Sequence, residues 1–215
     1  MTEQLVGRII KANSISDAWY RGLNIIWKHG TKITDERGTE IKEFLNLMIV
    51  IKDPYTNQRP ADISWNTERL EEYAKQLISG DNLQDFEYTY GQRLRNWNDE
   101  IDQIQYVIDK LKNNSNTRRA TAVTWIPSID TKVDEVPCMI IDDLKIRNGR
   151  VNLTTLFRSH DFAGAYPANL YGLSKLLEYI ADRVGLKPGK ITTVSVSAHI
   201  YDHDWDKIEQ IVEGV

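Results

Sequence analysis

The sequence predicts an α/β or α+β fold, in which helices pack on a mixed β-sheet. Two observations lead to this prediction. Segments with apolar residues at helical spacing alternate along the chain with short apolar runs that suit strands. The pair Asn148-Gly149 stands between two of these runs, where it predicts a tight hairpin. Because no Pro/Gly/Ser-rich linker interrupts the 215 residues, we expect a single domain over residues 1–215.

Residues 17–28 are expected to form the first helix, because their apolar residues recur on one helical face. Ser16 is the expected N-cap, and Gly30 is placed to end the helix. The polar residues 31–39 are expected to form a loop. Residues 44–51 are almost continuously apolar, which is typical of a strand inside a sheet.

Two further amphipathic helices are expected, over residues 66–78 and 98–112. Asn66 or Thr67 can cap the first of them, and Gly80 follows its last turn. Each has apolar residues on one face, so each is expected to cover part of the sheet.

The second half of the chain contains a strand candidate at residues 121–126. The two arms of the predicted hairpin are residues 138–146 and 151–157. An amphipathic helix over residues 170–184 follows, and then a strand over residues 191–200, where apolar and polar residues alternate. A short helix is expected to finish the chain.

Charge and composition exclude several classes of protein. The 31 acidic and 27 basic residues give a formal net charge of -4, so nucleic acid is not expected as a main partner. Met1-Thr2-Glu3-Gln4 lacks the basic start and apolar core of a signal peptide, and no apolar stretch is long enough to span a membrane. A single cysteine cannot form an internal disulfide, which fits a reducing compartment. We therefore expect a cytoplasmic protein.

Cys138 is the only cysteine, and two interpretations of it stay open from the residues alone. A free cysteine beside the apolar run Met139-Ile140-Ile141 is typical of a small side chain packed in a core. A nucleophilic cysteine must instead ionise, which requires cationic neighbours that lower its pKa. Arg158, at the end of the second hairpin arm, is the candidate neighbour.

Polar residues after the hairpin carry a family resemblance. Residues 158–169 resemble the nucleotide-binding signature of the thymidylate synthase family, in which Arg-Ser-x-Asp is followed by Pro and Asn. Pro137-Cys138 is similar to the nucleophile motif of that family. The short length and divergent N-terminal third are most similar to its archaeal branch. The other matching blocks follow the order of the family and contain Arg37, Tyr90, Arg118-Arg119, and His199 with Tyr201.

The resemblance implies a thymidylate synthase, a methyltransferase that converts dUMP to dTMP by reductive methylation. Cys138 would add to C6 of uracil, and Asn169 would hold O4 and N3–H, which favours uracil over cytosine. The methylene donor would be a reduced pterin, either 5,10-methylene-tetrahydrofolate or 5,10-methylene-tetrahydromethanopterin. No metal is implied.

A 5′-phosphate suits several arginines with a hydroxyl donor. His199 and Tyr201 alternate on a strand and are implied to bind the ribose 3′-hydroxyl. The resemblance also implies an obligate homodimer, formed through a sheet face, in which two arginines act on the neighbouring subunit's nucleotide. Those two are Arg118 and Arg119, and the other expected phosphate ligands are Arg37, Arg158 and Ser159.

Asp161 is implied to orient the pterin and an ordered-water network, and Tyr90 to help remove the C5 proton. The family also carries a glutamate on the second predicted helix. Tyr73 occupies the matching position, with Glu71 and Glu72 adjacent, and we choose Glu72 for the role.

Other interpretations stay open. Arg118-Arg119 can be a solvated pair, His199 a core histidine, Tyr201 a packing residue and Asn169 a helix cap. A pyrimidine nucleotide hydroxymethylase acting on dCMP, CMP or dUMP would share the thiolate step. A nucleotide- or RNA-binding relative without catalysis would need only the phosphate site, and Met139, where many family members carry His, is consistent with that alternative.

Overall fold

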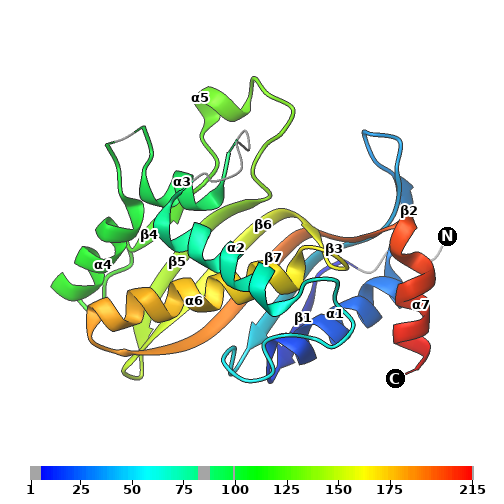
Figure 1. Ribbon diagram of the computed structural model, residues 1–215, viewed down its shortest axis with the longest axis horizontal. Helices are drawn as coiled ribbons and strands as arrows, with labels where there is room; N and C mark the ends of the chain where they lie inside the picture. Colours follow the sequence, from blue (N-terminus) through cyan, green and yellow to red (C-terminus); the bar gives the residue numbers. More distant parts are fainter. Residues whose placement is uncertain (1–5, 82–87, 99, 215) are drawn as a thin grey trace.

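One mixed sheet organises the molecule, as the sequence predicted (Figure 1). The computed structural model describes residues 6–81, 88–98 and 100–214. The sheet has seven strands in the order β1-β3-β7-β6-β5-β4, and β2 pairs with β3 off this path. The strands are β1 (Arg8–Ala12), β2 (Thr31–Thr34), β3 (Glu40–Ile51), β4 (Thr121–Val123), β5 (Met139–Arg147), β6 (Arg150–Asp161) and β7 (Lys187–Tyr201).

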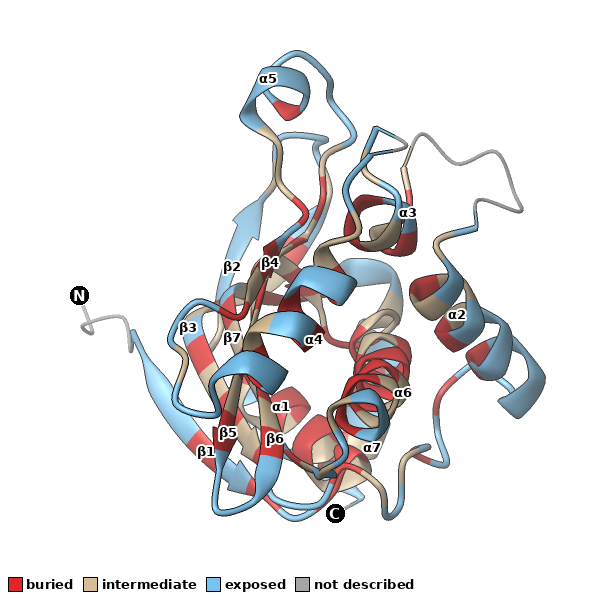
Figure 2. Cartoon of the chain, turned by 90° about the vertical axis from the view of Figure 1, so that its left-hand side faces the viewer, coloured by how far each residue is buried: buried red, intermediate tan, exposed pale blue. Residues whose placement is uncertain are grey.

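The longer helices gather on one side of the sheet, and Figure 2 shows the opposite face without a helix. Helix α6 contacts β6 and β7, α1 contacts β3, and α2 packs on α6. The helices are α1 (Ile15–His29), α2 (Thr67–Ser79), α3 (Tyr90–Arg95), α4 (Gln103–Asn113), α5 (Pro127–Asp130), α6 (Tyr166–Val184) and α7 (Trp205–Glu213), with a 3-10 turn η1 (Asp202–Asp204) before α7.

The crossover from β6 through α6 to β7 determines where polar side chains meet. Strands β6 and β7 are parallel neighbours, so the chain leaves β6 at Asp161 and enters α6 only a few residues later. The two strands therefore end at the same edge, with Asp161 opposite His199 in register. Hairpin β5–β6 begins at this edge too, because Met139 pairs with Phe157.

The predicted hairpin is confirmed. Asn148 and Gly149 have φ angles of 53° and 68°, the left-handed pair that a two-residue hairpin turn requires. The caps of α2 are confirmed as well, since the Asn66 side chain accepts from the Arg69 amide and Gly80 has a φ of 81°.

Several predicted boundaries are wrong. Residues 31–39 are not a loop, because Thr31–Thr34 forms β2 against β3. All residues of β2 are exposed, so it shows no alternation of buried and exposed residues that would predict a strand. Strand β1 was also missed; it has only five residues, and it pairs in parallel with β3. Helix α4 starts at Gln103 rather than residue 98, and β4 ends at Val123 instead of residue 126.

The first helix has a different cap from the expected one. Ser14, not Ser16, accepts from the Asp17 amide and caps α1. The hydroxyl of Ser16 donates to the Asn57 carbonyl instead, at 2.6 Å. Gly30 ends the helix as predicted, with its N–H bonded to the Ile26 carbonyl.

Within the described residues, every helix is too short or too polar to cross a bilayer. The N-terminal residues 1–4, expected to carry no targeting signal, lie outside that part of the chain.

A carboxyl group lies inside the core. Asp142 of β5 is 1% exposed, on the side of the sheet that the helices cover. It is in register with Thr155, which pairs in turn with Thr193, and both threonines are fully buried. Burial raises the pKa of Asp142 to about 7, and the Thr155 hydroxyl only partly opposes this effect.

We expect Asp142 to make the folded protein less stable as the pH rises from about 4 to about 7, because the folded chain keeps a proton that the unfolded chain has released. Over this window the free energy of unfolding falls by up to about 4 kcal/mol from this group alone. Urea unfolding at pH 5 and pH 8 measures the effect, and Asp142→Asn should reduce the difference between the two pH values.

The matched control is Asp143→Asn. Asp143 is the next residue on β5, only half-buried and bonded to the Thr121 hydroxyl at 2.6 Å. This variant should keep the pH dependence of the native protein. An unchanged pH dependence in Asp142→Asn would contradict the buried, protonated carboxyl.

Candidate active site

The thiol of Cys138 stands at the entrance to β5, where Arg158 of β6 holds the chain. The Arg158 guanidinium donates through Nε to the Pro137 carbonyl (2.9 Å) and through Nη2 to the Val136 carbonyl (3.0 Å). The same Nη2 lies 3.9 Å from Sγ of Cys138. One arginine therefore both fixes the segment before the cysteine and places positive charge beside its sulfur.

The expectation that cations lower the pKa of Cys138 is met only in part. Arg158 and Arg37 both lower the pKa of the thiol, but burial raises it by more, and Glu135 adds to the rise. The net shift is upward, so the thiol is protonated in the empty site. Cys138 as a residue is partly exposed and packs against the core from outside it.

Arg37 reaches this neighbourhood from the turn between β2 and β3. The Asp35 carboxylate holds that turn by accepting from the amides of Arg37 and Thr39. The Arg37 guanidinium pairs with Glu135 at 2.5 Å, and both side chains are more than half exposed. An exposed ion pair of this kind contributes little, about 0–1 kcal/mol, so the guanidinium is available to a stronger anion.

Three tyrosines line the approach to the thiol. The Tyr90 hydroxyl accepts from the Met139 amide (3.1 Å), directly after Cys138. Tyr88 donates to the Val136 carbonyl (3.2 Å), and Tyr73 accepts from Nδ2 of Asn169 (2.7 Å). Burial is the main cause that raises the pKa of each phenol, to about 12 for Tyr88. The phenols are therefore neutral hydrogen-bonding groups at physiological pH.

Asn169 lies in the first turn of α6, and its side chain points to another helix. The N-cap of α6 is Ala165, and no side chain caps it. Since the Asn169 amide bonds Tyr73 of α2, it is not a helix cap, and that alternative is wrong.

Asp161, His199 and Tyr201 come together where β6 and β7 end. The Asp161 carboxylate accepts from the amides of Ala163 and Gly164 at 3.0 Å each, which holds the turn into α6. His199 faces it in register and is 3% exposed. Burial lowers the pKa of His199, against the opposing charge of Asp161. The rings of His199 and Tyr201 lie 4.9 Å apart. Burial raises the pKa of Tyr201, and Asp161 and Cys138 add to the rise.

The groups described so far form a cluster around Cys138. Within one chain, three expected residues lie outside this cluster, and these are Arg118, Arg119 and Glu72. Ser159 lies beside it. Arg118 and Arg119 are exposed in the segment between α4 and β4, where the Arg119 carbonyl accepts from Tyr106. Ser159 is partly buried on β6, one residue after Arg158.

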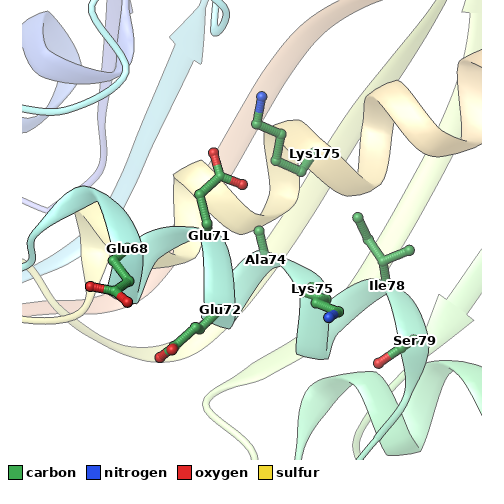
Figure 3. Close-up of a pocket in the computed structure, with 8 residues that line it drawn as sticks. All are labelled: Glu68, Glu71, Glu72, Ala74, Lys75, Ile78, Ser79 and Lys175. Carbon is green, nitrogen blue, oxygen red and sulfur yellow. The ribbon is translucent and has the colours of Figure 1, made fainter.

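Glu72 is the third expected residue outside the cluster, and our choice of it is not supported. It is exposed and lines a surface pocket on α2 together with Lys175 of α6, and Figure 3 shows its carboxylate turned away from that lysine. Glu71 bonds the Tyr171 hydroxyl. Successive helical residues point about 100° apart, so Tyr73 alone of the three reaches Asn169. No set of three or more His, Cys, Asp or Glu side chains is grouped for a metal in the described ranges.

Sequence reasoning missed Tyr88 and the buried His160. Neither has a signal in the sequence, because a tyrosine near a turn and a histidine before an aspartate are common. Their partners come from the segment before β5, from β7 and from α6, which only the folded chain brings close.

Comparison with known proteins agrees with this arrangement. A model of the family described as thymidylate synthase matches residues 40–214, which contain Cys138 and the other cluster residues outside the β2–β3 turn. The chain belongs to the thymidylate synthase family. Members of this family are methyltransferases whose substrates are dUMP and a methylene-folate-type donor.

Several proteins similar to this member of the thymidylate synthase family come from methanogenic archaea. A protein of Methanococcoides burtonii named "Putative thymidylate synthase" is 77% identical over 98% of this chain and 97% of its own length. Proteins of the same name from Methanosarcina mazei and Methanothermobacter thermautotrophicus are 74% and 42% identical, over 98% and 95% of this chain and 97% and 98% of their own lengths. The predicted similarity to the archaeal branch is thus confirmed.

Proposed function

We propose that this chain is a thymidylate synthase that converts dUMP to dTMP by reductive methylation. One observation carries the proposal: Sγ of Cys138 lies 3.9 Å from the guanidinium of Arg158. Burial raises the pKa of Tyr73, which bonds Asn169, and the nearby Cys138 adds to that rise. The proposed nucleophile, the cation beside it and the amide proposed to bind the pyrimidine therefore lie at one edge of the sheet.

In the proposed reaction, the Cys138 thiolate adds to C6 of uracil, and the electron pair of the C5–C6 bond moves toward O4. The Asn169 amide donates to O4, and such a donor can lower a barrier by roughly 3 kcal/mol. C5 then bonds the methylene carbon as one carbon–nitrogen bond of the donor breaks. C5 loses its proton while the second carbon–nitrogen bond breaks, which leaves a methylene group on the ring. Hydride from the same pterin completes the methyl group as sulfur leaves C6. Tyr90 and water near Asp161 form the proposed route for the C5 proton.

The groups that we propose to bind the nucleotide lie around the thiol. Arg37 can exchange its exposed contact with Glu135 for the 5′-phosphate, which carries nearly two charges. Arg158 and Ser159 are proposed phosphate ligands at the end of β6. His199 and Tyr201 are proposed to bind the 3′-hydroxyl of the ribose. The donor is 5,10-methylene-tetrahydrofolate or 5,10-methylene-tetrahydromethanopterin, bound as a second substrate without a metal.

The bare face of the sheet supports a homodimer. A row of apolar side chains, one from each strand of the main path, runs in register across it, and the next row along the strands is buried under the helices. Ile9 and Val123 at the two ends are 67% and 41% exposed. An apolar face of this extent suits an obligate interface between two copies. The row is Ile9, Met48, Val194, Leu156, Ile141 and Val123.

In such a dimer, Arg118 and Arg119 would act on the partner's phosphate, since they are exposed and outside the cluster of their own chain. We expect two inactive variants, Cys138→Ser and the double variant Arg118→Ala/Arg119→Ala, to restore activity when mixed and allowed to exchange subunits. Half of the dimers become mixed and each has one intact site, so about a quarter of native activity should return. Recovery of less than about a twentieth of native activity would indicate that the arginines act within their own chain.

Tritium release from 5-tritiated dUMP tests the reaction. The assay is run under reducing conditions, as in the cytoplasm, with each pterin in turn. Release together with dTMP identified by mass is expected. A hydroxymethylated product alone would indicate a hydroxymethylase, and dUMP, dCMP and CMP are compared for that reason. Folded dimer that binds dUMP but releases no tritium with either pterin would indicate a nucleotide-binding protein.

A further inference from the structure

The amide of Asn169 has more hydrogen-bonding positions than a pyrimidine can use. Its oxygen accepts two hydrogen bonds, and its NH2 group donates two. A uracil ring takes one of each, through N3–H and O4. The protein must satisfy the remaining acceptor and the remaining donor, and the groups that do so decide which end of the amide meets which edge of the base.

The donor end of the amide is held by α2. Nδ2 of Asn169 donates to the Tyr73 hydroxyl at 2.7 Å. Tyr73 is positioned by packing, with its ring 5.9 Å from Trp65 and its edge against Gly172 of α6, where an added Cβ would lie 2.8 Å from the ring. The hydroxyl therefore occupies a defined place beside the amide.

The acceptor end of the amide has a candidate partner in His160, a buried histidine that the proposed reaction does not use and whose ring lies 4.9 Å from that of Tyr166, three residues before Asn169 on α6. His160 is 1% exposed, and its ring stacks on Phe157 at 3.7 Å. Nδ1 lies 2.9 Å from the Ser195 hydroxyl on β7. Burial lowers the pKa of His160 to about 3, so the imidazole is neutral and carries one N–H.

The second ring nitrogen, Nε2, has no hydrogen-bond partner among the described residues. The Asn169 side chain nevertheless raises the pKa of His160, the effect expected when an amide oxygen faces a ring N–H. Hydrogen bonds in an empty site are often long and shorten once the substrate is bound. If Ser195 donates to Nδ1, the single proton of the ring is on Nε2, the nitrogen that has no other partner among the described residues.

We propose that Tyr73 and His160, with Ser195 behind the imidazole, are positioning residues that hold the Asn169 amide in the orientation that selects uracil. Tyr73 accepts from Nδ2, and Nε2–H of His160 donates to Oδ1. The free N–H then donates to O4, and the free lone pair of Oδ1 accepts from N3–H. The inference rests on the proposed action on dUMP.

The reversed amide has a different consequence. Turned by 180°, Asn169 would present its oxygen to the 4-position and its NH2 group to N3, which matches cytosine. Loss of either holding group lowers the cost of this reversal. The ratio of the affinities for dUMP and dCMP therefore reports on the two holding groups, whereas damage to the site as a whole weakens both nucleotides together.

Calorimetric dissociation constants of dUMP and dCMP test the inference in the native protein and in Tyr73→Phe, His160→Leu and Ser195→Ala. We expect each variant to narrow the preference for dUMP by about tenfold, the effect of one hydrogen bond. His160→Gln, which keeps an N–H donor, should recover part of the preference. Tyr166→Phe is the matched control, because it removes a buried hydroxyl from the ring 4.9 Å from His160, and that hydroxyl has no hydrogen-bond partner among the described residues.

The outcomes separate this inference from the proposed function. Native protein that binds neither nucleotide would contradict the proposed function. Native protein that prefers dUMP, with the same preference in folded Tyr73→Phe and Ser195→Ala, would overturn the positioning role and leave the function intact. Equal weakening of both nucleotides would also overturn it, and so would a native preference for dCMP.

Discussion

Substitution of Cys138 by serine is expected to abolish tritium release from 5-tritiated dUMP, with a loss on the order of 10³-fold or more. The hydroxyl of serine lies at the same place but ionises far less readily than a thiol, so it cannot add to C6 at an observable rate. Binding should survive, because the sulfur is a reacting atom and not a nucleotide ligand. The dissociation constant for dUMP should change by less than about tenfold, or 1.4 kcal/mol.

The adduct with 5-fluoro-dUMP identifies the nucleophile directly. Fluorine at C5 cannot leave as the proton does, so the covalent complex with the donor should persist. In the native protein we expect a mass increase on the peptide that contains Cys138, and none in Cys138→Ser or Cys138→Ala. Tritium release by Cys138→Ser, or an adduct on another residue, would contradict the assignment. Loss of dUMP binding together with activity would show that the thiol is structural.

Substitution of Arg93 by methionine is expected to cost about 3–5 kcal/mol of stability, because it leaves a buried carboxylate unpaired. Arg93 of α3 and Asp130 of α5 form a two-pronged ion pair, at 2.8 and 3.2 Å, with side chains 7% and 0% exposed. Asp130 also accepts from the Ile126 amide. This pair anchors α5, from which the chain continues to the segment that Arg158 holds before Cys138.

Urea unfolding at pH 7 measures that cost. Arg21→Met is the control, because Arg21 forms an exposed contact with Asp17 at 4.0 Å, and a loss of about 1 kcal/mol or less is expected there. The double variant Arg93→Met/Asp130→Leu should recover part of the stability, because it leaves no buried charge. A loss below about 1 kcal/mol in Arg93→Met would show that the pair adds nothing to the fold.

Local chemistry made much of the fold predictable. Asn148-Gly149 has few alternatives to a tight turn, and Asn66 with Gly80 marks the two ends of α2, since caps and positive φ angles depend on neighbouring residues. The errors occurred where no local signal exists. Strand β2 is exposed throughout, and it pairs with β3, which no local pattern in its four residues predicts.

The candidate site, like the fold, could be predicted from the sequence only in part. The reactive residue types and their order, from Arg37 to Tyr201, could be read from the chain, because a thiol, guanidinium groups and an amide are specific to the chemistry they support. Sequence alone did not indicate that Tyr73 rather than Glu72 faces Asn169, because this depends on how α2 is rotated against α6, which packing decides.

The sequence by itself determined the family and the mixed sheet, and it singled out Cys138 as the proposed nucleophile, since each of these follows from residue type and spacing along the chain. Only the tertiary structure decided the ionisation of Cys138, the partners of Asn169 and the burial of Asp142 and His160. These properties depend on solvent exclusion and on distances between groups that are far apart in sequence. Such distances are set when the helices pack on the sheet.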